Sequence, residues 1–131
     1  MRALKPLFLA TFLLSVLGSC AFDVVSVKQV PTNLEETAAS RSSFELGEEV
    51  QLELPAGYDR VLRKGTQWHF VGMIPQGEVY RTKDQVLTVE ASNIHEAYIV
   101  VSSGRLVGFY LPVERSFSPL RPVNLPIKEG N

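Results

Sequence analysis

Apolar and polar residues alternate along much of the chain beyond Phe44, and this alternation predicts a domain built from β-strands. Between 50 and 54 the residues Val, Leu and Leu alternate with Gln and Glu, which is the period-two pattern of a half-buried strand. A second strand is expected over 66–74 (TQWHFVGMI), shorter extended runs over 78–81 and 85–90, and a short strand or turn over 58–64. Within 66–74, period two places on one face Thr66, Trp68, Phe70 and Ile74.

The longest apolar stretch, 97–111 (AYIVVSSGRLVGFYL), predicts a β-hairpin with its loop at Ser103-Gly104. Both faces of this hairpin are apolar, whereas a surface hairpin shows one polar face. We therefore expect it at the centre of the sheet, with the core on one side, another segment covering the other side, and close packing at Gly108. A two-residue loop sets the register, pairing Val101 with Leu106, Val100 with Val107, Ile99 with Gly108 and Tyr98 with Phe109.

The segments that flank these strands are less regular. Residues 22–30 (FDVVSVKQV) are rich in β-branched residues and fit either a first strand or a tether. The polar stretch 32–43 predicts a frayed helical turn or a loop, because no apolar face follows its capping-box spacing. Residues 91–96 likewise predict a loop or a single helical turn. Four prolines between 112 and 126 predict an extended tail that lies across the sheet, not a central strand.

Strand-like runs separated by turn signals, with no amphipathic helix, predict an all-β fold. We expect a small antiparallel barrel or sandwich of about six or seven strands, spanning residues 44–131. Residues 20–131 together are long enough for one domain with a single hydrophobic core.

An N-terminal apolar run stands apart from this domain. Residues 1–5 include two basic residues and no acidic one, and residues 7–17 are apolar apart from one Thr and one Ser. Eleven residues make about 16 Å of helix, roughly half of a bilayer core. The run therefore fits a secretory signal peptide over residues 1–19 better than a membrane span.

The stretch Leu17-Gly18-Ser19-Cys20 resembles the lipobox of bacterial lipoproteins: an aliphatic residue, two small residues and a cysteine. The resemblance implies cleavage between Ser19 and Cys20 and a diacylglyceryl group on the Cys20 thiol. It covers only the first twenty residues and implies nothing about the domain beyond. Because the chain has one cysteine, a lipid there leaves no thiol for catalysis, metal binding or a disulfide.

Lipidation would make residues 20–43 a tether and place the protein in the bacterial cell envelope. In enteric-type sorting, an Asp directly after the lipidated cysteine retains a lipoprotein in the inner membrane, and here that residue is Ala21. The resemblance thus favours the outer membrane, facing the periplasm. The first predicted partner is therefore the membrane, to which the acyl chains would anchor the protein.

The charge of the mature chain, residues 20–131, disfavours one class of partner. The whole chain has 13 basic and 14 acidic residues, and removing Arg2 and Lys5 leaves 11 basic against 14 acidic, a net charge of −3. No basic block is present beyond the cluster Arg60, Arg63 and Lys64. Nucleic-acid binding is therefore not expected.

The sequence contains no motif that is typical of an enzyme or a metal site. Its two histidines, His69 and His95, lack the further ligands of a zinc site, and neither a Gly-x-Ser-x-Gly elbow nor a Gly-rich phosphate loop occurs. We therefore predict no catalytic residue, no metal and no cofactor besides the lipid on Cys20. Aromatic residues are expected in the core; if some are exposed together, the candidates for a binding face are Trp68, Tyr80, Tyr98 and Tyr110.

These observations favour a non-enzymatic envelope lipoprotein that binds a protein partner in an assembly or inhibitory role. Two alternatives stay open at this point. One is a carrier with a small-ligand cavity inside the barrel. The other is an envelope hydrolase, which would need a cleft that joins His69 or His95 to a carboxylate.

Overall fold

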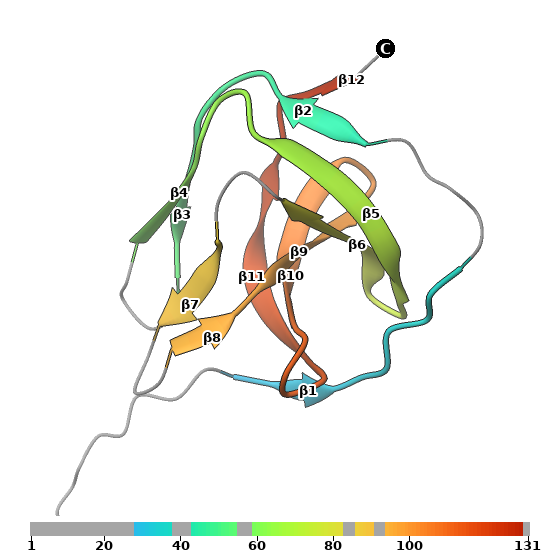
Figure 1. Cartoon of the computed structure of the whole chain (residues 1–131). Coiled ribbons are helices and arrows are strands. Elements are labelled where there is room, and N and C mark those ends of the chain that lie inside the picture. Colours follow the sequence, from blue (N-terminus) through green and yellow to red (C-terminus); the bar gives the residue numbers. More distant parts are fainter. Residues whose placement is uncertain (1–27, 38–42, 55–58, 83–85, 91–93, 130–131) are drawn as a thin grey trace, which may run out of the picture.

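The computed structural model describes residues 28–37, 43–54, 59–82, 86–90 and 94–129, and all their regular elements are β-strands (Figure 1). The predicted all-β class is confirmed. The predicted signal peptide, Ser19, Cys20 and much of the tether lie outside the described residues. The strands are β1 (Val30–Pro31), β2 (Phe44–Leu46), β3 (Val50–Glu53), β4 (Asp59–Leu62), β5 (Gln67–Ile74), β6 (Gly77–Thr82), β7 (Thr88–Glu90), β8 (Ile94–Glu96), β9 (Tyr98–Ser102), β10 (Arg105–Leu111), β11 (Ser116–Asn124) and β12 (Ile127–Glu129).

Eight strands form one antiparallel sheet in the order β1-β11-β10-β9-β6-β5-β2-β12. β3 pairs with β4 and β7 pairs with β8 in two small additional sheets. The large sheet curls, and its end strand β12 is the chain continuation of β11 (Figure 1). It is not closed into a barrel, so the sandwich-like alternative describes it. The strands outnumber the six or seven predicted, partly because β1 and β12 are only two and three residues long.

The predicted central hairpin is present as β9 and β10. Its loop residues Ser103 and Gly104 have φ values of 52° and 75°, which fit the type I′ turn that joins twisted antiparallel strands. Val101 faces Leu106, as the two-residue loop predicts. β9 pairs with β6 on its other side, so the hairpin lies inside the sheet.

Beyond this first pair, a β-bulge at Val107 shifts the register by one residue. Gly108 faces Val100 and Phe109 faces Ile99. A bulged residue is left outside the ladder, and alternation alone does not reveal it when the residues on both faces are apolar. Three predicted pairs are therefore wrong: Val100 with Val107, Ile99 with Gly108, and Tyr98 with Phe109.

Apolar side chains pack on both faces of the hairpin, as predicted. The larger core cluster includes Ile99 and Phe109, together with the fully buried Trp68 of β5. A smaller cluster on the opposite face contains Val100 and is completed by Ile74, Val79, Tyr110 and Phe117. Val107 packs only partly buried against this smaller cluster, because it is the bulged residue.

β5 carries a second bulge, between Phe70 and Gly72. It sends Ile74 to the smaller cluster while Trp68 stays in the larger one. The prediction that these two residues share a face is therefore wrong.

The smaller cluster is covered by the segment that precedes β2. Leu34 packs against it, and Glu35 pairs with Met73 of β5 through two backbone hydrogen bonds of 2.8 and 2.9 Å. Gly72 permits this contact, since a Cβ atom there would lie 2.6 Å from the Glu35 carbonyl oxygen. The described part of the polar stretch, residues 32–37, is thus a loop, the second of the two predicted alternatives, and it is fixed to the sheet by the single bridge at Glu35. By contrast, residues 94–96, where we expected a loop or a single helical turn, form the strand β8.

The C-terminal segment is a strand of the sheet, where the sequence predicted a tail lying across it. β11 pairs with β10 along its length, and β1 covers only its first two residues. Pro119 and Pro122 are tolerated because the second edge of β11 has no strand partner beyond Phe117 in the described ranges. The segment still helps to cover the sheet, as predicted, because Leu120 packs in the larger cluster and Phe117 in the smaller one.

Candidate functional site

Two chain segments that pair at one end of the domain separate toward the other. β2 runs on through Gly47 into β3, while β11 runs on through Pro126 into β12. β12 pairs with β2, and the N–H of Gly47 donates to the carbonyl of Pro126 at 2.7 Å. Further along, β3 pairs only with β4, and none of the strands described here joins β3 to β11. We call this opening between β3 and β11 the seam.

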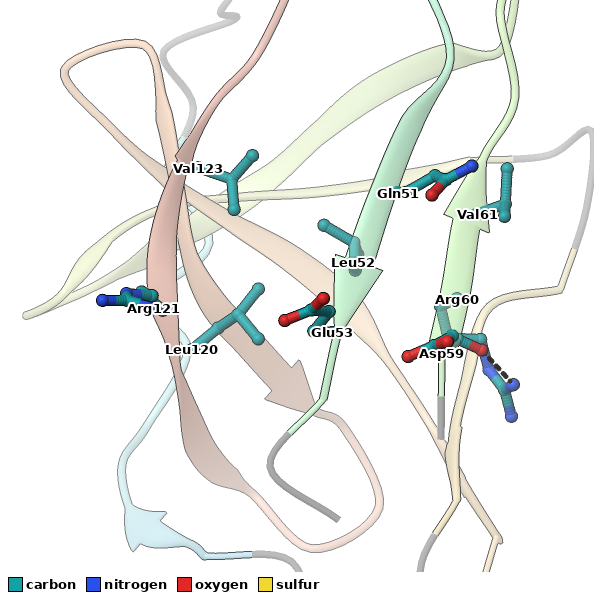
Figure 2. A pocket seen from close by; sticks show the side chains of 9 residues that line it. All are labelled: Gln51, Leu52, Glu53, Asp59, Arg60, Val61, Leu120, Arg121 and Val123. Carbon is teal, nitrogen blue, oxygen red and sulfur yellow. Dashed lines mark hydrogen bonds between the residues drawn. The ribbon is translucent and has the colours of Figure 1, made fainter. Parts of the chain in front are cut away.

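A groove of about 410 Å³ lies along the seam (Figure 2). Leu52 of β3 points across it toward Leu120 and Val123 of β11, so its floor is apolar and is continuous with the larger core cluster. The volume lies within the range of about 300–1,000 Å³ that is usual for ligand sites. The lining residues are Gln51, Leu52, Glu53, Asp59, Arg60, Val61, Leu120, Arg121 and Val123.

The mouth of the groove is acidic on the side of β3 and β4, where Glu53 and Asp59 are exposed. Arg60 also lines the groove, but its Nε donates to the Thr88 carbonyl at 2.8 Å and its Nη1 to the Asp59 carbonyl at 2.9 Å, and these bonds hold its guanidinium on the side away from β11 (Figure 2). Arg121 of β11 also lines the groove, and in Figure 2 its guanidinium lies on the side of the strand away from β3. The groove therefore combines an apolar floor with an acidic wall, formed by Glu53 and Asp59, and with Arg121 on the side of β11.

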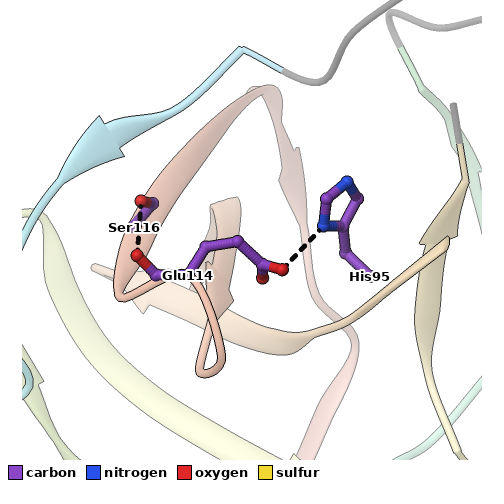
Figure 3. A network of polar contacts seen from close by, with 3 residues as sticks. All are labelled: His95, Glu114 and Ser116. Atoms are coloured by element: carbon purple, nitrogen blue, oxygen red, sulfur yellow. Dashed lines mark hydrogen bonds and ion pairs between the residues drawn. The ribbon is translucent and has the colours of Figure 1, made fainter. Parts of the chain in front are cut away.

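A second polar feature joins His95 of β8 to Glu114, in the turn between β10 and β11 (Figure 3). The Nδ1 atom of His95 lies 2.9 Å from Oε2 of Glu114, and the two side chains are 12% and 26% exposed. The hydroxyl of Ser116 donates to the backbone carbonyl of Glu114 at 3.1 Å, so it is not aimed at the imidazole as a nucleophile would be. The sequence could not name Glu114 as a carboxylate partner of His95, because the contact is non-local.

The other histidine has a simpler environment. Nδ1 of His69 lies 3.3 Å from the hydroxyl of Ser43, in an exposed contact. Within the described ranges, no group of three or more His, Cys, Asp or Glu side chains is placed to hold a metal ion. The same ranges contain no helix with the length and hydropathy needed to cross a membrane.

The four aromatic residues considered for a binding face do not form one. Trp68 and Tyr80 are buried in the larger cluster, while Tyr110 is buried and Tyr98 half-buried in the smaller cluster. They are divided between opposite faces because both faces of the sheet are covered. Their role is packing, as in the edge-to-face contact of Tyr80 with Phe44, whose ring centroids are 4.8 Å apart.

Comparisons with known proteins do not add to this geometry. The chain matches no protein-family model, no curated protein and no solved structure. The functional argument therefore depends on the groove, the His95–Glu114 pair and the N-terminal motif.

The groove was not predicted, although the sequence contained one sign of it. Alternation in β3 correctly predicted Leu52 inside and Glu53 outside, but the groove depends on where two distant segments stop pairing. The sign lay in Pro119 and Pro122. Prolines in an apolar strand indicate that one of its edges is free, and we interpreted them as evidence against a strand.

Proposed function

We propose that this protein is a lipid-anchored lipoprotein of the bacterial cell envelope whose β domain binds another envelope protein without catalysing a reaction. The groove along the seam carries the proposal, because it is a hollow with an apolar floor on the outside of a packed domain. The lipobox resemblance of Leu17-Gly18-Ser19-Cys20 supports the anchor. Ala21 after Cys20 favours the outer membrane, facing the periplasm.

Dense packing supports a site on the surface over a ligand cavity inside the sheet. Trp68, Ile99 and Leu106 each have 0% exposure and occupy the middle of the larger cluster. A small-ligand carrier would need this space for its ligand, and interiors of this kind hold few voids larger than a water molecule. The groove is accordingly the better candidate for binding.

The experiment that tests this function is a pull-down of the lipidated chain from cross-linked envelopes. We expect one protein partner, lost with Val123→Arg, which places a charge among the apolar residues of the groove floor. Val113→Arg is the matched control, because Val113 is 76% exposed and does not line the groove. If no specific partner is recovered under any growth condition, or if both variants retain it equally, the groove does not carry this function.

A hydrolase is the second candidate, favoured by the contact between His95 and Glu114. A carboxylate that orients an imidazole is the usual arrangement of a general base. The purified mature chain should then turn over peptide, ester or glycan substrates, and His95→Gln should abolish the turnover. An absence of turnover with the parent chain would remove this candidate.

A further inference from the structure

Both walls of the groove are strand edges that lack a strand partner in the described part of the chain. β3 pairs on one side only, with β4. β11 pairs with β1 only at its first two residues, and beyond Phe117 it pairs only with β10. A free edge presents a row of backbone N–H and C=O groups to which another extended chain can bond. These two edges border one groove, so a single inserted strand can contact both.

The two edges differ in what they offer. β11 contains Pro119 and Pro122, which have no N–H group, and prolines on an edge protect it against unspecific pairing. β3 has the sequence VQLE and contains no proline. An inserted chain would therefore form most of its backbone hydrogen bonds with β3, and β11 would contribute side-chain contacts and acceptors.

The side chains of the groove determine which sequence fits. Successive residues of a strand point to opposite faces, so every second residue of an inserted chain would lie over Leu52, Leu120 and Val123. Those residues must be apolar. The intervening residues would pass the acidic wall formed by Glu53 and Asp59, where Lys or Arg is favoured.

We propose that the groove binds an extended segment of another protein, which is added as a strand between β3 and β11 and alternates apolar residues with at least one basic residue. The proposal rests on the partner-binding function above and deepens it by naming the kind of partner. In this mode backbone hydrogen bonds supply affinity, while the apolar floor and the acidic wall supply specificity.

The first test locates the partner in cells that produce the lipidated full-length chain. A photo-crosslinking amino acid is placed at Glu53 or at Val123, one on each wall of the groove, and at the exposed control positions Glu36 and Val113, which do not line it. Both wall positions should capture the same short stretch of one protein. The control positions should capture neither that stretch nor that protein.

The second test examines the strand mode with a synthetic peptide of the captured stretch and the purified mature chain. Backbone N-methylation at every second peptide residue should abolish binding in the phase whose N–H groups face β3. It should weaken binding less in the other phase, whose N–H groups can reach only the acceptors of β11. Hydrogen exchange of residues 50–53 should slow when the peptide is bound. Glu53→Lys should weaken binding about tenfold, while Glu36→Lys should leave it unchanged.

The outcomes separate this proposal from the broader function. A partner captured at the control positions, with both wall positions empty, would overturn strand addition and leave partner binding intact. Adducts formed with a second copy of this chain, or with its own residues 22–27, would overturn the claim that another protein fills the seam. Binding that survives N-methylation in both phases would overturn the strand mode. No adduct at any position would contradict partner binding and strand addition together.

Discussion

At the scale of single residues, Gly108 leaves the least room for a Cβ atom among the described glycines. This residue of β10 lies between Val100 of β9 and Pro119 of β11, and a Cβ atom there would lie 2.6 Å from the ring of Phe117 and even closer to the Ser118 carbonyl. Gly108→Ala should therefore lower the free energy of unfolding by about 1–3 kcal/mol, the usual cost of overpacking. Urea denaturation of the mature chain carrying Cys20→Ser measures this loss.

Gly47→Ala is the matched control for Gly108→Ala. A Cβ atom at Gly47 would lie 3.3 Å from the Pro126 carbonyl oxygen, which is close but needs only a small shift. Its loss of stability should be clearly smaller than that of Gly108→Ala. If Gly108→Ala is as stable as the parent, β10 and β11 are not packed as closely as the structure has them.

The His95–Glu114 contact makes a separate prediction about stability. Removing the imidazole by His95→Ala leaves a carboxylate that is only 26% exposed without this hydrogen-bond partner, and hydrogen bonds to charged groups contribute about 1.5–3 kcal/mol. Because the pair is partly screened by solvent, we expect a loss of about 1–2 kcal/mol. A double-mutant cycle with Glu114→Gln should give a coupling energy above about 0.5 kcal/mol.

The exposed contact between His69 and Ser43 supplies the reference for that cycle. Ser43→Ala should change stability by less than about 0.5 kcal/mol, as is usual for surface substitutions. Additive effects of His95→Ala and Glu114→Gln would mean that the two side chains do not interact in solution. The pair would then have no part in tying β8 to the turn between β10 and β11.

At the scale of elements, the β9–β10 hairpin tests the bulge. Ile99 has 0% exposure, so Ile99→Ala should cost about 2–4 kcal/mol. The plain alternation predicts the same cost for Val107→Ala, but Val107 is the bulged, partly buried residue, and we now expect about 1 kcal/mol. Thermal melts compare the two variants with the exposed control Glu36→Ala, which should be nearly neutral. Equal losses for Ile99→Ala and Val107→Ala would contradict the bulge.

Most individual strands were predictable because their signals are local. Alternation identified β3, the apolar run identified β9 and β10, and Ser103-Gly104 identified their turn, because each signal lies within a few residues of the structure that it determines. Both bulges escaped prediction, since the flanking residues are apolar on both faces and either register buries them. β11 was missed for a different reason: its prolines are compatible with a strand only when one edge is free.

At the scale of the whole molecule, the fold class could be predicted but the candidate site could not. A chain of strand signals without helix signals allows few architectures other than antiparallel β. The seam, however, exists because β12 pairs with β2 while β11 does not pair with β3, and no local pattern encodes where two distant segments separate. The contact between His95 and Glu114 is non-local in the same way.

At the same scale, the lipobox prediction makes membrane attachment of the whole molecule depend on Cys20. Cys20→Ser removes the thiol that would receive the lipid, so the domain should move from the membrane fraction to the soluble fraction or accumulate as precursor. The matched control is Ala21→Asp, which keeps the cysteine and, in enteric-type sorting, should shift the protein from the outer to the inner membrane. Fractionation with immunoblotting distinguishes these results.

One outcome would refute the anchor itself: Cys20→Ser that is processed normally and still sediments with membranes. While the lipid is attached, the chain between Cys20 and β1 limits how far the domain can reach from the membrane. The ten residues from Cys20 to Gln29 precede β1 and span at most about 35 Å when fully extended. The released variant should then lose its cross-links at Glu53 and Val123 only if the partner is itself held at the membrane, because release removes proximity and leaves the groove unchanged.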